Sequence, residues 1–259
     1  MSKSVHPTES EYEMGAAMNQ PPHLIEGSGV TLSFGARRIF SDLSFQVNRG
    51  EVVLLLGDNG AGKTSLLNIV SGYTRPSSGS ITYHLRGASL TSPVEPEKLA
   101  RLGIGRLWQE IRLFPEMSVL DNVLAATPSL ARTGPLSAVW DAMTRRNHRE
   151  PIEDAERNLS IVGMDGRLAS SCDMLSVGQM KRVALARLFQ MGAELLLLDE
   201  PLSGLDRRSC SSMAETIRDL SKKHGKGVLI VEHRHDIARP VADRVWRLQD
   251  GQLAAEGTT

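Results

Sequence analysis

The most informative segment of this 259-residue chain is the octapeptide Gly57-Asp58-Asn59-Gly60-Ala61-Gly62-Lys63-Thr64. It fits the pattern G-x-x-x-x-G-K-[ST], which forms a phosphate-binding loop where it follows a buried strand and begins a helix. Both flanks meet this condition. The run Val52 to Leu56 is apolar throughout, and residues 63–71 have helical apolar spacing that Gly72 can end. The segment therefore predicts a binding site for a nucleoside triphosphate.

Phosphate chemistry explains each residue type in this loop. Glycines allow backbone N–H groups to approach phosphate oxygens, and the positive end of the following helix points at them. Lys63 supplies a cation for the β- and γ-phosphates, and the hydroxyl of Thr64 is suited to Mg²⁺. We expect every residue from 57 to 64, together with Ser65, to contact the nucleotide.

A second buried run ends in two carboxylates. Leu195 to Leu198 is followed by Asp199 and Glu200, and in open α/β sheets ligands bind at the carboxyl ends of the strands. Asp199 is suited to hold Mg²⁺, and Glu200 is then available to polarise an attacking water. Two acids that merely end a strand are the simpler interpretation, but the phosphate loop favours the functional one.

The apolar pattern predicts an α/β fold. Continuous apolar runs at 52–56, 195–198 and 228–231 are typical of central parallel strands that helices cover on both faces. Alternation at 30–34 and 43–47 predicts an antiparallel sheet with one solvated face. A two-residue turn at Asp250-Gly251 predicts a hairpin of residues 245–249 and 252–255. We expect helices at about 63–71, 119–126, 137–162, 177–191 and 208–224.

Composition narrows the class of protein. Lysine plus arginine number 30 and aspartate plus glutamate number 30, so the chain lacks the basic excess of a general nucleic-acid binder. Cys172 and Cys210 show no metal-type spacing, which favours a reducing compartment. No apolar run approaches the roughly 20 residues of a transmembrane helix. We therefore expect a soluble chain with a structureless polar tail at residues 1–26.

Further segments follow in the order typical of one ATPase family. Leu175-Ser176-Val177-Gly178-Gln179 can form a helix capping box. It also resembles the L-S-G-G-Q signature of ATP-binding cassette (ABC) ATPases, with Val177 in place of a glycine. Gln109 resembles the Q-loop glutamine, residues 203–206 resemble the D-loop, and His233 resembles the switch histidine. Phe34 stands where the family places an aromatic residue that stacks on adenine. The resemblance covers residues 29 to 257.

This resemblance implies a P-loop NTPase fold. It comprises a RecA-like α/β core with an antiparallel β subdomain and a helical signature subdomain at about 112–190, all within a nucleotide-binding domain at 27–257. It implies ATP and Mg²⁺ as cofactors, with Thr64, Gln109 and Asp199 around the metal. Glu200 would be the general base, and His233 and Gln109 would position water, metal and phosphate.

The family resemblance also implies an assembly. ATP would lie between the phosphate loop of one subunit and the signature residues of a second ATPase subunit, which are Ser176, Val177, Gly178 and Gln179. Within the family, the chain is similar to ATPases of branched-chain amino-acid importers. The similarity lies in residues 104–109 followed by Arg112-Leu113-Phe114, and in Val231-Glu232-His233. That similarity implies an energy-supplying subunit on the cytoplasmic face of the cell membrane, bound to integral membrane permease subunits.

Three other classes of function compete with this interpretation. One is the ATPase of an ABC exporter. Another is a non-transport ABC protein that acts on DNA or ribosomes. Such proteins carry long heptad insertions, or two cassettes with basic linkers, and this chain shows neither; we expect no nucleic-acid partner. The third class is a GTPase or small-molecule kinase. Such a protein would lack the signature-like segment that this chain has at residues 176–179, and the chain has no N-K-x-D guanine motif.

Overall fold

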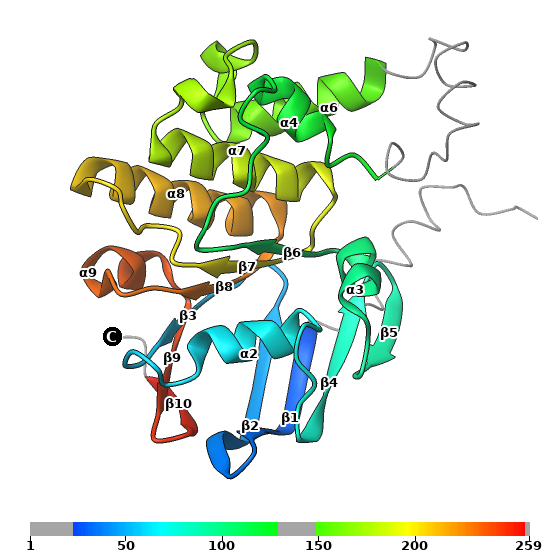
Figure 1. Ribbon diagram of the computed structural model, residues 1–259, viewed down its shortest axis with the longest axis vertical. Coiled ribbons are helices and arrows are strands. Elements are labelled where there is room, and N and C mark those ends of the chain that lie inside the picture. Colours follow the sequence, from blue (N-terminus) through cyan, green and yellow to red (C-terminus); the bar gives the residue numbers. More distant parts are fainter. Residues whose placement is uncertain (1–22, 129–148, 257–259) are drawn as a thin grey trace, which may run out of the picture.

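Two β-sheets and a set of helices make up the fold in the computed structural model, which describes residues 23–128 and 149–256 (Figure 1). The strands are β1 (His23–Phe34), β2 (Arg37–Asn48), β3 (Val52–Leu56), β4 (Ser78–Leu85), β5 (Ala88–Thr91), β6 (Ile104–Leu107), β7 (Leu195–Asp199), β8 (Gly227–Val231), β9 (Arg244–Gln249) and β10 (Gln252–Glu256). The helices are α2 (Lys63–Val70), α3 (Pro96–Leu102), α4 (Val119–Leu124), α6 (Arg149–Ile161), α7 (Val177–Gln190), α8 (Arg207–His224) and α9 (His235–Ala238).

The six-stranded sheet carries the candidate site. Its strand order is β10-β9-β3-β8-β7-β6, and the neighbours from β9 to β6 all pair in parallel. The three continuous apolar runs form β3, β8 and β7, as predicted. β10 returns antiparallel to β9 through Asp250 and Gly251. Both turn residues have positive φ angles, 51° and 74°, as a two-residue type I′ turn requires, and the predicted hairpin is confirmed.

Side-chain alternation places two separate cores against this sheet. In β3, the side chains of Val52, Leu54 and Leu56 pack with α7 and α8, and those of Val53 and Leu55 pack with α2 and the antiparallel sheet. β7 and β8 divide in the same way between the two cores. Because both faces of each strand are covered, every residue of β3 is fully buried. This explains why the sequence reads as a continuous apolar run.

The second sheet is antiparallel, with the order β2-β1-β4-β5. Strands at 30–34 and 43–47 were predicted, and both lie within the longer β1 and β2. The prediction of a structureless tail at residues 1–26 is wrong at its C-terminal end. There β1 begins at His23, and both Leu24 and Ile25 are fully buried. The polar Glu26, together with the glycines at 27 and 29, hid this part of the strand.

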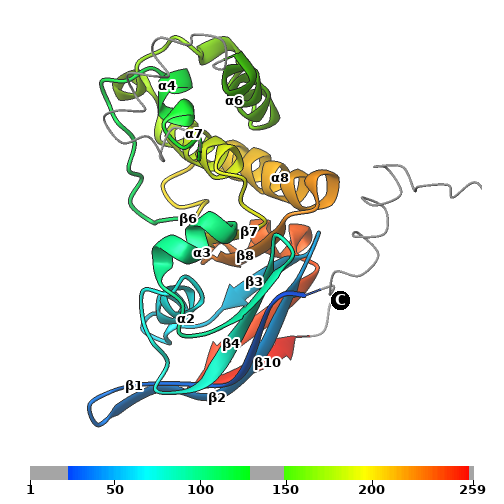
Figure 2. The ribbon, with the colours of Figure 1, turned by 90° about the vertical axis from the view of Figure 1, so that its right-hand side faces the viewer.

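The predicted helices are found with small shifts at their ends, within the part of the chain that the structure describes. The expected helix at 137–162 is represented by α6, and residues 129–148 lie outside the described residues. Figures 1 and 2 show α4, α6 and α7 together on the opposite side of the central sheet from α2. This separation keeps the N-termini of α2 and α7 in different layers of the same chain.

Candidate functional site

The phosphate loop connects the carboxyl end of β3 to the first turn of α2, and it runs closer to its surroundings than side chains permit. A Cβ atom at Gly57 would lie 2.4 Å from the carbonyl oxygen of Leu248, and one at Gly62 would lie 2.7 Å from Cγ2 of Ile39. Gly62 caps α2 with a φ of 102°. Larger residues at either position would displace the loop, so the two glycines fix its path.

Lys63 lies across its own loop. Its Nζ donates hydrogen bonds to the carbonyl oxygens of Gly57 at 2.7 Å and Asp58 at 2.9 Å. Burial lowers the pKa of Lys63, while the negative charges of Glu200, Asp58 and Asp199 raise it. These carbonyl contacts and nearby carboxylates keep the ammonium group at the N-terminus of α2. The helix dipole also favours an anion there, so both features attract a phosphate group.

Asp199 is buried at the end of β7 and faces a buried arginine. Nη2 of Arg106 lies 3.5 Å from Oδ2 of Asp199, and Nη1 donates to Oδ1 of Asn68 at 2.7 Å. The same guanidinium stacks 3.7 Å from the centre of the Trp108 ring. Burial raises the pKa of Asp199, whereas the charge of Arg106 and hydrogen bonds from Arg106 and Thr64 lower it. Arg106 thus reduces the cost of a buried carboxylate at this position.

Glu200 is the meeting point of three loops. Nε2 of Gln109 donates to its Oε2 at 3.0 Å, and Nε2 of His233 lies 3.4 Å from its Oε1. These residues follow β6, β7 and β8, which are adjacent parallel strands. Glu200 itself has a φ of 51°, an uncommon conformation for a residue with a side chain. The structure therefore brings the three predicted catalytic residues together.

The signature residues lie elsewhere in the chain. Ser176 caps α7, accepting from the backbone N–H of Gln179 at 3.3 Å, while the Gln179 side chain accepts from the N–H of Ser176 at 3.0 Å. The predicted capping box is confirmed. Val177 is 43% exposed. α7 packs on the opposite face of the central sheet from α2, so the structure does not bring residues 176–179 to the phosphate loop of the same chain.

The phosphate loop borders a surface pocket that also contains cations. Asp58, Asn59, Gly60 and Ala61 line it together with Arg37 and Arg38 from the start of β2. Arg37 and Arg38 were not predicted as site residues, although two adjacent cations shortly after Phe34 were a usable signal. Phe34 pairs with Arg37 at the β1–β2 turn and is 58% exposed, which leaves its ring open to a planar partner.

The residues at this site fit Mg²⁺. Thr64 offers a hydroxyl oxygen, Asp199 a carboxylate and Gln109 an amide oxygen, and Mg²⁺ prefers oxygen ligands of these types. Thr64 lowers the pKa of Asp199, so two of these groups lie near each other. A site that shares its metal with substrate phosphates needs few protein ligands. Among the described residues, no group of three His, Cys, Asp or Glu side chains is placed to hold a metal ion.

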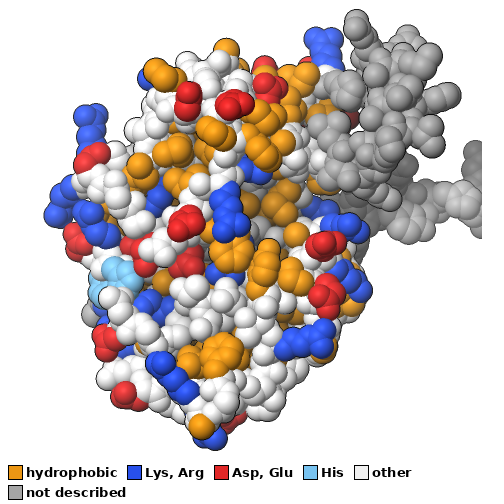
Figure 3. Space-filling model, in the orientation of Figure 1, with side chains coloured by type: hydrophobic (Ala, Val, Ile, Leu, Met, Phe, Trp, Pro, Cys, Tyr) orange, Lys and Arg blue, Asp and Glu red, His pale blue; other side chains and the backbone are white. Residues whose placement is uncertain are grey.

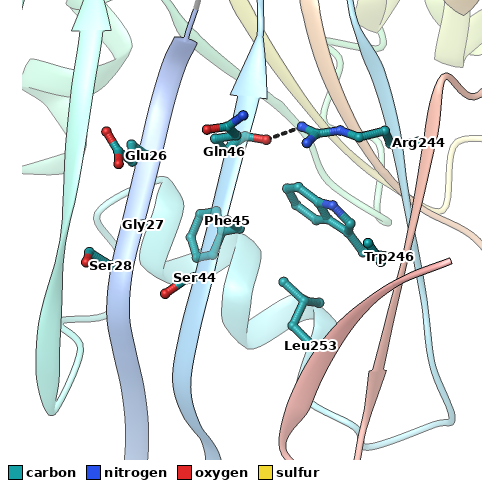
Figure 4. Close-up of a pocket in the computed structure, with 10 residues that line it drawn as sticks. Glu26, Gly27, Ser28, Ser44, Phe45, Gln46, Arg244, Trp246 and Leu253 are labelled. Atoms are coloured by element: carbon teal, nitrogen blue, oxygen red, sulfur yellow. Dashed lines mark hydrogen bonds between the residues drawn. The ribbon is translucent and has the colours of Figure 1, made fainter. Parts of the chain in front are cut away.

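A second surface hollow lies between β1–β2 and β9–β10 and contains none of the predicted site residues (Figure 4). The rings of Phe45 and Trp246 lie 5.9 Å apart at its base. Arg244 donates to the carbonyl oxygen of Gln46 and pairs with Glu51. Because these contacts join the two sheets, the hollow belongs to the framework of the fold.

Comparisons with known proteins point to one family. The profile of the ABC transporter family matches residues 40–203. The high-affinity branched-chain amino acid transport ATP-binding protein LivG of Salmonella typhimurium is 31% identical over 245 residues, which are 93% of each chain. BraF of Pseudomonas aeruginosa, which carries the same description, is 31% identical over 242 residues and 93% of each chain. A solved ATP-binding cassette of an ABC transporter, in its ADP conformation, has a TM-score of 0.77 at 27% identity and 91% coverage of both chains.

We predict that Lys63→Ala weakens the binding of ATP with Mg²⁺ by about 10- to 100-fold, because the variant loses charge-assisted hydrogen bonds to phosphate. Titration calorimetry measures this change, and Lys98→Ala on the exposed surface of α3 is the control. Unchanged affinity in the Lys63 variant would remove the phosphate loop from the nucleotide site.

We predict that Glu200→Gln keeps ATP binding but lowers turnover by about 10²–10⁴-fold, the range typical of a lost general base. Phosphate release measures turnover, and Glu215→Gln on the exposed face of α8 should behave like the wild type. The amide should also trap a dimer in ATP, which size-exclusion chromatography detects. Near-normal hydrolysis would transfer the role of base to His233.

Proposed function

Because this chain belongs to the ABC transporter family and is one of its ATP-hydrolysing subunits, we propose that it drives a membrane importer of the branched-chain amino-acid type. The observation that carries the proposal is the match of nearly the whole chain to LivG and BraF, both described as transport ATP-binding proteins for these amino acids. The arrangement of Glu200, Gln109 and His233 beside the phosphate loop supports the chemistry.

The proposed chemistry is an in-line attack of water on the γ-phosphorus of ATP. Glu200 accepts a proton from the water as the new P–O bond forms, and the bond to the β–γ bridging oxygen breaks to leave ADP and phosphate. His233 donates to the γ-phosphate, and Gln109 orients the water. Lys63 and the N–H groups of the loop stabilise charge that develops on the phosphate oxygens. Bound Mg²⁺ would neutralise phosphate charge, held by Thr64, Asp199 and Gln109.

The proposed active form is a head-to-tail dimer. α2 and α7 lie in different layers of one chain, so the signature residues of that chain are not placed to contact its own nucleotide. A second subunit can present the N-terminus of α7 to the γ-phosphate, where the helix dipole and its free N–H groups favour an anion. ATP would then close the dimer, and hydrolysis would let it reopen.

We assign to the permease a surface that carries exposed apolar side chains. Phe114, Met117 and Met174 are 50%, 36% and 76% exposed. Their loops are joined because the N–H of Asp173 donates to the carbonyl oxygen of Pro115 and that of Cys172 to the carbonyl oxygen of Met117. We call these three residues the apolar loop patch. It joins the chain that follows Gln109 to the chain that precedes Ser176, so a partner bound here can affect both motifs.

The proposed location is the cytoplasmic face of the cell membrane, where the subunit would be held by its permease partners. No helix among residues 23–128 and 149–256 has the length and apolar character to cross a bilayer. On the face drawn in Figure 3, acidic and basic side chains of the described residues lie interspersed, and apolar side chains gather over the helical layer in the upper half. An apolar surface on this chain suits a membrane-protein partner better than it suits nucleic acid.

We predict that Met174→Glu abolishes the co-purification of an integral membrane protein with native complexes of this chain, because a charge in the apolar loop patch costs free energy on burial. ATP binding should remain. Thr91→Glu, which adds the same charge on the exposed edge strand β5, is the control and should retain the permease. Recovery of ribosomes or DNA in place of a membrane protein would contradict the transport proposal.

We predict that Ser176→Arg blocks hydrolysis without affecting ATP binding by the monomer, and that mixing it with Glu200→Gln restores part of the activity. In a head-to-tail dimer of one copy of each, one site carries both substitutions and the other carries neither. Loss of the helix cap alone lowers the free energy of unfolding by about 0.5–2 kcal/mol, and thermal melting measures this effect separately. If mixing restores no activity, each chain builds its own site and the dimer proposal fails.

A further inference from the structure

Two buried charges lie behind the candidate site, and the proposed chemistry does not use them. The side chain of Lys181 extends from α7, and Glu232 follows β8; each residue is only 2% exposed. Burial of a charged group costs several kcal/mol unless hydrogen bonds and opposite charges compensate for it. The hydrogen bonds of these two residues therefore indicate which parts of the chain they hold in place.

Lys181 is bonded to the backbone of Glu200. Its Nζ donates to the carbonyl oxygen of Glu200 at 2.8 Å, to the carbonyl oxygen of Ser203 at 2.8 Å and to Oγ of Ser203 at 3.0 Å. An ammonium group has three N–H donors, and all three are used. Oγ of Ser203 donates in turn to the carbonyl oxygen of Glu200 at 2.9 Å, so this carbonyl is held from two sides.

Lys181 holds the peptide that follows the Cα of Glu200, and a second contact holds the peptide that precedes it. Glu200 has a φ of 51°, a conformation that persists only where the surroundings impose it. Its N–H donates to the carbonyl oxygen of Val231 at 2.9 Å. With the N–H fixed by β8 and the carbonyl fixed by α7, the Glu200 carboxylate is held between Gln109 and His233.

Glu232 ties the neighbouring loops together through backbone hydrogen bonds. One of its carboxylate oxygens accepts from the N–H of Leu202, and the other accepts from the N–H groups of His233 at 3.0 Å and Arg234 at 3.2 Å. Burial lowers the pKa of Lys181, while the negative charges of Glu232 and Glu200 raise it. The segment after Glu200 and the segment that carries His233 therefore share one carboxylate.

We propose that Lys181 is a positioning residue for Glu200, and that Glu232 ties the loop after Glu200 to the segment that carries His233. The inference rests on the proposed role of Glu200 as general base. It has a structural consequence beyond that role. Lys181 stands on the same helix as Ser176, so the helix that carries the signature is bonded directly to the Glu200 backbone of its own chain. Movement of α7 on dimer closure would reach the Glu200 carboxylate through this ammonium.

The test is a double-mutant cycle between Lys181→Met and Glu200→Gln, read by single-turnover hydrolysis of γ-labelled ATP. Methionine is unbranched, reaches about as far as Cε of lysine, and removes the ammonium group with its three donors. We expect Lys181→Met to lower the hydrolysis rate by about 10- to 100-fold, the loss typical of a misplaced reacting group, with an unchanged ATP dissociation constant. Because Lys181 acts through Glu200, the substitution should cause no further loss in the Glu200→Gln background.

Arg182→Met is the matched control on the same helix. Arg182 donates to the carbonyl oxygen of Val162 at 2.7 Å and to Oγ1 of Thr216 at 3.1 Å, so its loss should lower the melting temperature without selective loss of turnover. Lys181→Arg keeps a cation and should recover part of the rate. If Lys181→Met does not yield folded protein, Lys181→Gln, which lacks the charge, replaces it in the same cycle.

The outcomes separate the two proposals. An unchanged rate in Lys181→Met, or an equal fold-loss in both backgrounds, would overturn the positioning role, because a merely structural lysine would act independently of the residue at position 200. Normal turnover in the single variant Glu200→Gln would instead overturn the general-base assignment, and that result is obtained without any change at Lys181.

Discussion

The candidate site depends on one constraint of parallel sheets, namely that all strands present their carboxyl ends at the same edge. β3 ends at the phosphate loop, β7 ends at Asp199, and β8 leads to His233. The three strands are adjacent and fully covered on both faces, so their ends cannot shift without opening two cores at once. Apolar side chains that never contact a nucleotide therefore place the charged groups that would.

Charged groups that are buried at this edge of the sheet need opposite charges nearby. Asp199 and Lys63 each lose solvation, and each is compensated by an opposite charge nearby: Arg106 beside Asp199, and the carboxylates of Asp58, Asp199 and Glu200 around Lys63. Lys181 also loses solvation, and the negative charges of Glu232 and Glu200 partly offset this effect on its pKa. Because ionic interactions strengthen where water is excluded, these charges hold their partners in defined positions and restrict the conformations of the loops.

Glu200 combines a strained backbone with an unusually complete set of restraints. Its carboxylate contacts residues that follow β6 and β8, its N–H is bonded to β8, and its carbonyl is bonded to α7. A positive φ at a residue with a side chain costs of order 1–3 kcal/mol, which the surrounding contacts must offset. The proposed base thus lies where the two cores, the signature helix and the edge of the sheet meet.

By itself, the sequence determined the strands and helices that have strong periodic patterns, the turn at Asp250-Gly251 and the capping box of Ser176. These features depend on local spacing and on backbone chemistry, which a sequence displays directly. β4, β5 and α3 were not predicted. In β4, Ile81, Tyr83 and Leu85 do alternate with polar residues, so a usable pattern was missed. β5 and α3 have only 4 and 7 residues, too few to show a clear period. The start of β1 was also missed, because the polar residue and glycines after Leu24 and Ile25 interrupt the pattern.

Only the tertiary structure determined how distant residues meet. Nothing in the order of residues indicates that Arg106 faces Asp199 or that Lys181 bonds the backbone of Glu200. Such contacts depend on strand order and on which face of a helix meets the sheet. Local spacing carries no information about either, because both follow from the packing of segments that are far apart in the chain.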